Sequence, residues 1–550
     1  MSTSFERFFN ILELLDMLRN RLGLQDVSRL ACTNRKLHQL CTPLLFKNLL
    51  DVVLSQENQP YRVSRILSTT PGMEAFARNV QHISTLAFGV DELACYYNSL
   101  VAFEDSTGTP TTSPPGLPPP DVDASQLIAM PRMTNLSRLA MWLSKSHYRL
   151  YTLPSVKSAQ ATFAQLYFVL SLHPGLKTLQ LFGAPIMDLQ EGWRLGRIIS
   201  GMPRLEWLSI EVHCGSDDWS GLCSGILFSC PPTLVYLSLN FFEGRSRDPV
   251  QPWNCFEHEN NEDEVAEARR RVPLVNLKGL RLRGMYGYYW DSGIDQSIFA
   301  HCPNIKQLDL TSFMGDHDIA TIGEYIGKVC PKIESLHCRD FDYGEGRQES
   351  LAFRIMSGLP AQQITRLEYT GLPFDFNSSA AILAVQQHST SLREIRINGV
   401  DGYYRISGST ILKECLNLEV LYFPYDHFEG HYITLNDGLE QPWACTKLRQ
   451  LTLGISGCEL PIELGVQPYY RRPTPITLTQ TERQHLAQLK RLYQQLGGLT
   501  ALQELDLTMV SLEESEQIDD DMLGMAMSFP AMLNLEDAST ACPSPQVKLR

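Results

Sequence analysis

The sequence predicts an α/β solenoid, in which short strands form one parallel sheet and helical segments return the chain along its outside. One pattern, L-x-x-L-x-L, recurs from end to end, as at residues 205–210, 234–239 and 305–310. Most neighbouring copies start about 26 to 31 residues apart, a period typical of solenoids. The intervals between copies contain segments that are apolar at helical spacing.

Each copy of the pattern predicts a strand. Its last residues alternate, so Leu208 and Ile210 point to one side while Trp207 and Ser209 point to the other. A single strand cannot bury its apolar side, but stacked repeats share one continuous core. The copies begin at Ile83, Leu136, Leu176, Leu205, Leu234, Leu277, Ile305, Ile333, Ile364, Leu392, Leu418, Leu448 and Leu502.

The return segments predict helices over residues 161–172 and 318–329. The second is followed by Cys330-Pro331, which would end a helix before the next strand, and Cys230-Pro231 and Cys302-Pro303 occupy the same place in their repeats. These repeats resemble the cysteine-containing leucine-rich repeats often found behind an F-box. The resemblance implies a horseshoe with a parallel sheet on its concave face and helices outside.

The N-terminal residues are similar to an F-box over about 40 positions. Residues 10–22 predict an amphipathic helix, Asp26 is placed to cap a second helix, and the unit closes with P-x-L-F-x-x-L from Pro43 to Leu49. We expect a small all-α F-box at residues 1–50. The alternative interpretation is a helical element that only caps the open end of the solenoid.

The F-box resemblance implies binding to a Skp-type adaptor and, through it, to a cullin. The residues expected to bind the adaptor are Leu14, Leu15, Leu18, Leu22, Val27, Leu30, Leu40, Pro43, Leu45 and Phe46. The expected function is a non-catalytic, substrate-recognition subunit of a cullin-based ubiquitin ligase. The alternatives are a leucine-rich-repeat scaffold that is not coupled to ubiquitination and a regulatory subunit of an enzyme.

The repeat domain is expected over residues 51–540, followed by a tail at 541–550. Three insertions interrupt it: a Pro-rich one at 104–125, an acidic one at 245–271 and one at 455–480. The last leads into a predicted helix from Thr479 to Leu496. Its apolar face is expected to comprise Leu486, Leu489, Tyr493 and Leu496.

The composition indicates a protein of the cytoplasm or nucleus. The first residues lack the layout of a signal peptide, and no apolar run is long enough to span a membrane. The 14 cysteines include no C-x-x-C pair, and we expect Cys302 and Cys330 to be free, buried thiols. The net charge of −14 argues against nucleic acid as a partner.

No motif of the sequence predicts catalysis. Asp316-His317-Asp318 falls between a strand and a helix, where turn and capping residues are expected, so we predict no metal site. Nothing matches a phosphate-binding glycine loop, a nucleophile elbow or a zinc-binding helix. We therefore expect neither an enzyme nor a cofactor.

Alternate strand positions would line the concave face, where solenoids usually bind. The candidate target-binding residues are Trp142, Phe182, Trp207, Tyr236, Arg281, Arg283, His337, Arg339, Arg366 and Arg396. Asp309, Glu368 and Glu394 are interspersed, so one interpretation is a solvated face with ion pairs across strands. The other is a target site, with aromatic anchors and with arginines suited to an acidic or phosphorylated segment.

Overall fold

The computed structural model separates into two compact units, residues 1–277 and 278–550, which we describe in turn. The residues that the structure describes are 24–33, 35–47, 49, 70–89, 93, 96–97, 99–100, 131–143, 163–184, 189–214, 219–243, 273–284, 297–311, 319–340, 350–371, 379–399, 408–423, 433–435, 439, 441–456, 480–510 and 546–549.

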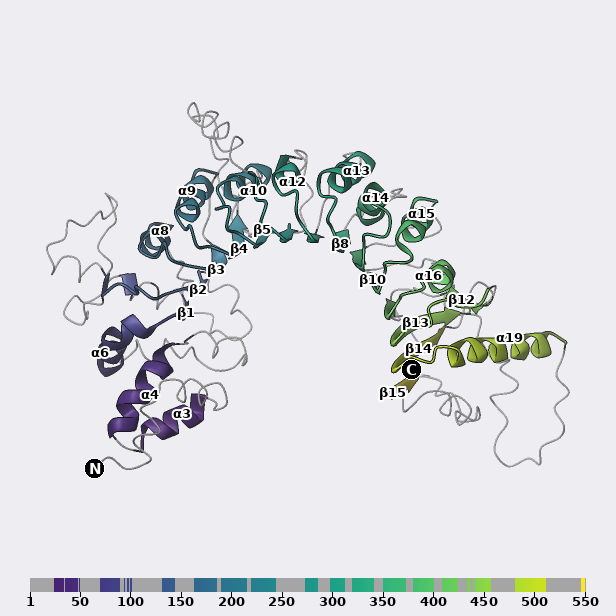
Figure 1. Cartoon of the computed structure of the whole chain (residues 1–550), viewed down its shortest axis with the longest axis horizontal. Helices are drawn as coiled ribbons and strands as arrows, with labels where there is room; N and C mark the ends of the chain where they lie inside the picture. The colour runs from purple at the N-terminus through teal and green to yellow at the C-terminus, as the bar shows by residue number, and fades with distance from the viewer. Residues whose placement is uncertain are drawn as a thin grey trace, which may run out of the picture. The chain divides into compact units, whose positions relative to one another are not determined.

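The first unit begins with helices and continues as alternating strands and helices (Figure 1). Its N-terminal helices are α3 (Leu24–Ala31), α4 (Arg35–Lys47), α6 (Thr70–Asn79) and the short 3-10 helix η1 (Val80–His82). Its strands are β1 (Thr85–Phe88), β2 (Arg138–Trp142), β3 (Thr178–Ala184), β4 (Trp207–Cys214) and β5 (Tyr236–Glu243). The helices between the strands are α8 (Phe163–Ser171), α9 (Leu189–Ser200) and α10 (Trp219–Phe228).

The second unit repeats the alternation of strand and helix. Its strands are β6 (Gly279–Arg283), β7 (Gln307–Thr311), β8 (Ser335–Asp340), β9 (Arg366–Gly371), β10 (Glu394–Gly399), β11 (Val420–Phe423), β12 (Ile433–Thr434), β13 (Gln450–Ser456), β14 (Glu504–Val510) and β15 (Gln546–Leu549). Its helices are α12 (Ser297–His301), α13 (Ile319–Val329), α14 (Leu351–Gly358), α15 (Ser379–His388), α16 (Gly408–Glu414) and α19 (Gln480–Gly497).

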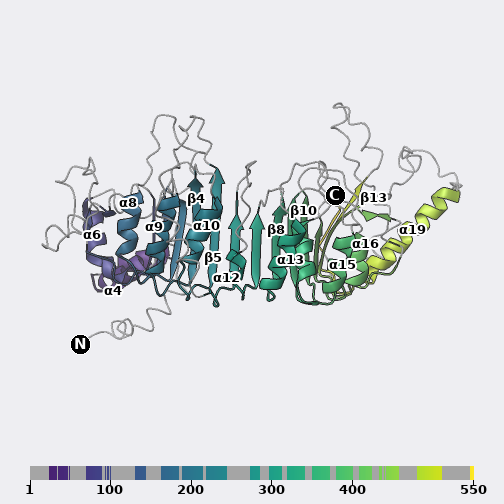
Figure 2. The same ribbon diagram turned by 90° about the horizontal axis from the view of Figure 1, so that it is seen from above.

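The strands of each unit are parallel and follow the chain order, side by side in Figure 2. All thirteen predicted strands are confirmed, and each begins two residues after the first apolar residue of its motif. The register places equivalent motif residues opposite one another, for example Leu179 opposite Leu208 and Leu208 opposite Leu237. The fold is therefore the predicted α/β leucine-rich-repeat solenoid.

The core lies between the sheet and the helices. The apolar motif residues are fully buried in successive repeats, as Leu205, Leu208 and Ile210 illustrate with exposures of 0%. Burying one such side chain contributes about 1.5–3 kcal/mol, so each repeat contributes several favourable terms that it could not obtain alone. In each unit the described helices between the strands lie on one face of the strands (Figure 1), and we call the opposite face the open face.

The predicted return helices are confirmed as α8 and α13. Helix α13 ends at Val329, directly before Cys330-Pro331. Cys302 and Cys330 are buried and form no disulfide, and the Cys330 thiol lies 3.5 Å from the carbonyl oxygen of Cys302. Burial raises the pKa of Cys330 to about 12, which keeps its thiol protonated.

Two strands near the C-terminus go beyond the sequence prediction. Strand β12 pairs with the end of β13, which runs to Ser456 into the predicted third insertion. Strand β15, in the predicted tail, pairs in parallel with β14. The predicted helix at 479–496 is observed as α19; Leu489 and Leu496 are buried on it as expected, and Leu492 joins them.

Among the helices that the structure describes, none is both long and apolar enough to cross a membrane.

Candidate functional site

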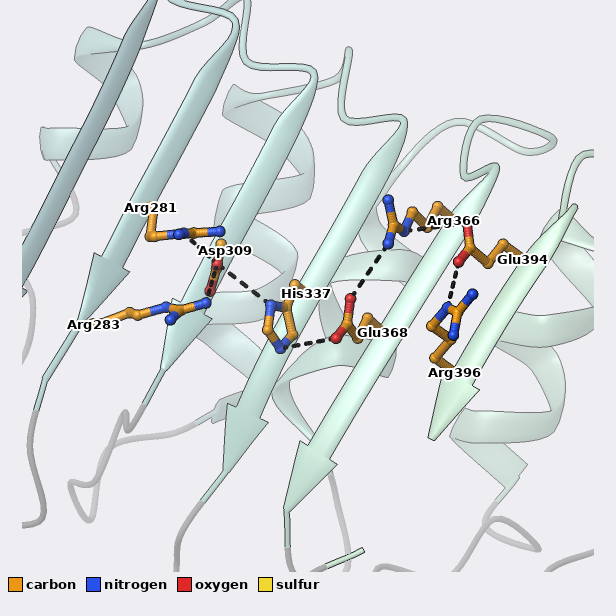
Figure 3. A network of polar contacts seen from close by, with 8 residues as sticks. All are labelled: Arg281, Arg283, Asp309, His337, Arg366, Glu368, Glu394 and Arg396. Atoms are coloured by element: carbon orange, nitrogen blue, oxygen red, sulfur yellow. Dashed lines mark hydrogen bonds and ion pairs between the residues drawn. The ribbon is translucent and has the colours of Figure 1, made fainter. Parts of the chain in front are cut away.

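The charged residues predicted for the concave face lie on the open face of the second unit. Eight of them form what we call the polar network (Figure 3). Its members are Arg281 and Arg283 of β6, Asp309 of β7, His337 of β8, Arg366 and Glu368 of β9, and Glu394 and Arg396 of β10. Strand alternation puts them on this face because the apolar motif residues take the opposite one.

Asp309 is the buried centre of the network's first half. Its Oδ2 lies 2.6 Å from Arg281 Nε, 2.9 Å from Arg283 Nη2 and 3.4 Å from His337 Nδ1. Burial acts to raise the pKa of Asp309, but the hydrogen bonds and charges of His337 and Arg283 outweigh it and lower that pKa to about 2. Asp309 therefore remains a carboxylate at any physiological pH.

Two glutamates organise the second half. Glu368 lies 3.9 Å from His337 Nε2 and 3.7 Å from Arg366 Nη2. Arg366 Nε lies 3.3 Å from Glu394, which also binds Arg396. Partly exposed ion pairs stabilise a fold by only about 0–1 kcal/mol each, so their main effect here is to fix the orientation of the guanidinium groups.

The register arranges one residue from each of six strands in a row across the open face. In order, the row is Arg281, Asp309, His337, Glu368, Arg396 and Tyr422. Tyr422 was missed by the sequence analysis, although it occupies the same motif position as the others. Its ring lies 5.6 Å from Arg396 Cζ, a cation–π contact that continues the row onto β11.

Arg339 lies on β8, in register with Thr311 and Thr370, and it is half-buried. With Arg339, the five predicted arginines face three carboxylates on this part of the sheet. This surface carries an excess of two positive charges when His337 is neutral. The ion pairs across strands that the solvated-face interpretation predicted are therefore present. The three carboxylates do not neutralise all five arginines.

The four predicted aromatic residues lie on the open face of the first unit, in two stacked pairs. Trp207 of β4 stacks on Tyr236 of β5 with ring centroids 3.8 Å apart. Trp142 of β2 stacks on Phe182 of β3 with centroids 4.8 Å apart. Trp207 remains 41% exposed, which is unusual for the largest apolar side chain and is typical of a contact surface.

The candidate adaptor-binding residues that the structure describes belong to the α3–α4 hairpin. Val27 is buried in a small core with Ala31 and Cys41, and Leu30 and Leu45 pack against it. Phe46 is half-buried, and Leu40 and Pro43 lie within α4. The remaining candidates lie outside the described residues: Leu14, Leu15, Leu18 and Leu22.

The hairpin joins the first sheet through a rung of backbone hydrogen bonds. The carbonyl oxygen of Lys47 accepts from Ser84 N at 3.0 Å, and Leu49 N donates to Thr85 O at 3.0 Å. In the next repeat, Ser84 O accepts in the same way from Ser137 N. The Lys47 carbonyl thus has the same hydrogen-bonding role toward β1 that the Ser84 carbonyl has toward β2. The end of the hairpin therefore lies beside β1, at the start of the first sheet, as a capping element would (Figure 1).

The described residues contain no group of three or more His, Cys, Asp or Glu side chains placed to hold a metal ion. The triplet Asp316-His317-Asp318 lies outside them. The most organised polar cluster that we find in the described part of the chain is the polar network, whose arginines and ionised carboxylates can bind charged groups.

Comparisons with known proteins add little. No protein-family model matches the chain, and no curated protein matches it. Among solved structures, the chain is similar to TLR13 in a TLR13–ssRNA13 complex, at 13% identity and a TM-score of 0.29 over 70% of this chain. The match covers 48% of that chain, about half its length. So distant a likeness says nothing of function, and the fold assignment rests on the repeat pattern and the strand register.

Proposed function

We propose that this protein is the target-recognition subunit of a cullin-based ubiquitin ligase. Its N-terminal helical element, which resembles an F-box, binds a Skp-type adaptor, and the open face of its repeats holds a target protein. The chain supplies no chemistry of its own. It supplies proximity, because a target held by the repeats presents a lysine to the ubiquitin donor that the cullin brings.

The single observation that best supports this proposal is the junction at Lys47. An adaptor bound at the hairpin is useful only if the hairpin holds a fixed position on the repeats that it serves. The rung from Lys47 to Ser84 and from Leu49 to Thr85, worth about 0.5–1.5 kcal/mol per hydrogen bond, provides that fixed attachment within the first unit.

The proposed target segment is acidic or phosphorylated. The open face of β6–β10 has five arginines and three carboxylates, and its guanidinium groups are already oriented by Asp309, Glu368 and Glu394. Oriented guanidinium groups lose little freedom on binding and match the planar geometry of carboxylate or phosphate. A purely apolar target would desolvate these charges without adding a compensating hydrogen bond or ion pair.

Adaptor binding is tested by Leu14→Asp combined with Leu18→Asp. Each change places a charge in the apolar face that the F-box resemblance assigns to the adaptor, so the double variant should fail to retain a Skp-type adaptor in a pull-down. The matched control is Gln39→Asp, an exposed position of α4. Equal retention of the adaptor by the double variant would leave the second candidate, a repeat scaffold that is not coupled to ubiquitination.

A further inference from the structure

We infer that the open face of β2–β5 binds an uncharged, extended, proline-containing segment of a partner protein. Two prolines about five positions apart would stack on the two aromatic pairs. This inference deepens the proposed function, since it rests on the open face being a binding surface. It concerns a different unit and a different chemistry from the polar network.

The register places the two aromatic pairs at opposite corners of a four-strand patch. Trp142 and Phe182 are in register at the later end of β2 and β3. Trp207 and Tyr236 are in register at the start of β4 and β5. The pairs are offset by four residues along the strands and by two strands across, which corresponds to a diagonal of about 16 Å. An extended polyproline helix covers that distance in about five residues.

A bulge in β3 helps to present one of the pairs. The register between β3 and β4 shifts between Leu181 and Ala184, and Phe182 and Gly183 lie at the shift. Gly183 has a φ of 67°, a conformation that glycine adopts without strain. Bulges redirect the side chains beside them, and here the redirected residue is the one that stacks on Trp142.

One row of small and polar side chains separates the two pairs. The middle row of the patch consists of Ala140, Gln180, Ser209 and Ser238, and the two central residues, Gln180 and Ser209, are half-buried. A partner backbone that crosses diagonally between the aromatic pairs passes over Gln180 and Ser209. The amide of Gln180 and the hydroxyl of Ser209 are donors for its carbonyl oxygens, which have no internal partner in a polyproline helix.

The charge on this patch favours a neutral segment. Of its described open-face residues, Arg138 and Glu211 are the charged ones, and they offset each other. Stacked aromatic rings also hold nucleic-acid bases, but such sites surround the rings with a basic groove, which this patch does not provide. Proline fits better, because its pyrrolidine ring packs against the faces of Trp and Tyr and its fixed φ reduces the entropy lost on binding.

The test uses the full-length chain and end-blocked, fluorescein-labelled peptides, with binding followed by fluorescence anisotropy. The probe is Pro-Pro-Ser-Ala-Ser-Pro-Pro, whose proline pairs are five positions apart. The control peptide, Pro-Pro-Pro-Pro-Ser-Ala-Ser, has the same composition without the spacing. We expect saturable binding of the probe and at least fivefold weaker binding of the control peptide, since only the probe reaches both aromatic pairs.

Three variants locate the site. Trp207→Ala should weaken binding of the probe by about fivefold to tenfold, the size of one aromatic contact, and Trp207→Phe should restore most of it. Tyr167→Ala is the matched control, because Tyr167 on α8 is 40% exposed, close to the 41% of Trp207. The inference is overturned by equal binding of the two peptides, by equal losses in Trp207→Ala and Tyr167→Ala, or by oligouridine binding at Trp207 in place of the probe.

Failure here and failure of the proposed function are distinguishable. The same Trp207→Ala variant is tested for retention of a Skp-type adaptor, which involves neither aromatic pair. If the unsubstituted chain retains the adaptor but does not bind the probe, the proline inference is rejected and the ligase proposal stands. Loss of adaptor retention in Leu14→Asp with Leu18→Asp, together with normal binding of the probe, would support both.

Discussion

At the scale of single residues, His388 is a buried histidine at a position where another repeat has cysteine, and it stabilises a turn that is longer than its counterparts. It stands four residues before its motif, the place that Cys230 has in another repeat, and it is 0% exposed. Its Nδ1 accepts hydrogen bonds from Gln363 N at 3.1 Å and from Ile364 N at 3.3 Å, while Nε2 donates to Met356 O at 2.9 Å. The turn that ends at Ile364 is longer than the turns before the other motifs. The imidazole of His388 accepts hydrogen bonds from the two backbone amides of this longer turn, Gln363 N and Ile364 N.

This geometry predicts a stability that depends on pH. Burial lowers the pKa of His388 below its ordinary value, although the hydrogen bond to Met356 opposes the effect. The unfolded chain therefore takes up a proton near pH 6.5, whereas the folded chain takes it up only at lower pH. The stabilisation from neutral His388 should be present above pH 6.5 and should decline as the pH falls below it.

His388→Cys checks this prediction, since cysteine is the residue found at the equivalent place. At pH 7.5 the variant should be less stable by about 1–3 kcal/mol, because the amides of Gln363 and Ile364 lose their acceptor. Between pH 7.5 and 5.5 it should lose less stability than the original chain. Urea unfolding at the two pH values measures both effects, and identical pH slopes in the two proteins would contradict this role for His388.

At the scale of elements, α13 and α14 pack closely because glycines line their contact. A Cβ on Gly327 would lie 2.6 Å from the carbonyl carbon of Gly358, and one on Gly323 would overlap the side chain of Arg354. Backbone atoms cannot move aside as a flexible side chain can. These glycines therefore set how near the two helices approach, and with them the spacing of repeats β7, β8 and β9.

Gly327→Ala should separate α13 from α14 and destabilise the contact by about 1–3 kcal/mol, the usual cost of overpacking. Hydrogen–deuterium exchange, read by mass spectrometry on peptides covering residues 319–329 and 351–358, should become faster there and remain unchanged in β1–β5. Gly497→Ala is the control, because a Cβ there meets nothing within 4 Å. Unchanged exchange in α13 and α14 would show that the helices adjust without cost.

The elements also show what a sequence predicts and what it does not. All thirteen motif strands were predicted, because each strand has its own alternation of apolar and polar residues. Strands β12 and β15 were not, because their existence depends on pairing with β13 and β14 and no motif marks them. Residues 10–22, which carry half of the F-box resemblance, lie outside the described residues, and the helix expected there stays a prediction.

The candidate site was predictable in composition but not in geometry. Repeat spacing alone placed Arg281, Asp309, His337 and Glu368 on one face. The sequence left open whether they pair with one another, because pairing depends on side-chain orientations that no repeat pattern encodes. The structure shows that the carboxylates are paired and that positive charge remains in excess.

At the scale of the whole molecule, a local excess of positive charge exists on a chain whose net charge is −14. Screening of charges by salt explains how a locally positive surface can exist on a negatively charged chain. The Debye length is about 8 Å at physiological ionic strength, so distant acidic residues contribute little at the open face and the nearest arginines dominate. An acidic target is therefore attracted at short range, and raising the salt concentration should weaken its capture.

Charge reversal decides whether these arginines select the target. Arg339→Glu combined with Arg366→Glu should weaken target capture by about 2 kcal/mol or more, because both changes reverse charge at a partly desolvated surface, while adaptor binding stays intact. Capture is measured by affinity purification with ligase turnover blocked and compared with Lys332→Glu combined with Lys447→Glu, which make the same change of charge at exposed turns. If both double variants capture the target equally but Trp207→Ala does not, the aromatic pairs select the target and the polar network does not.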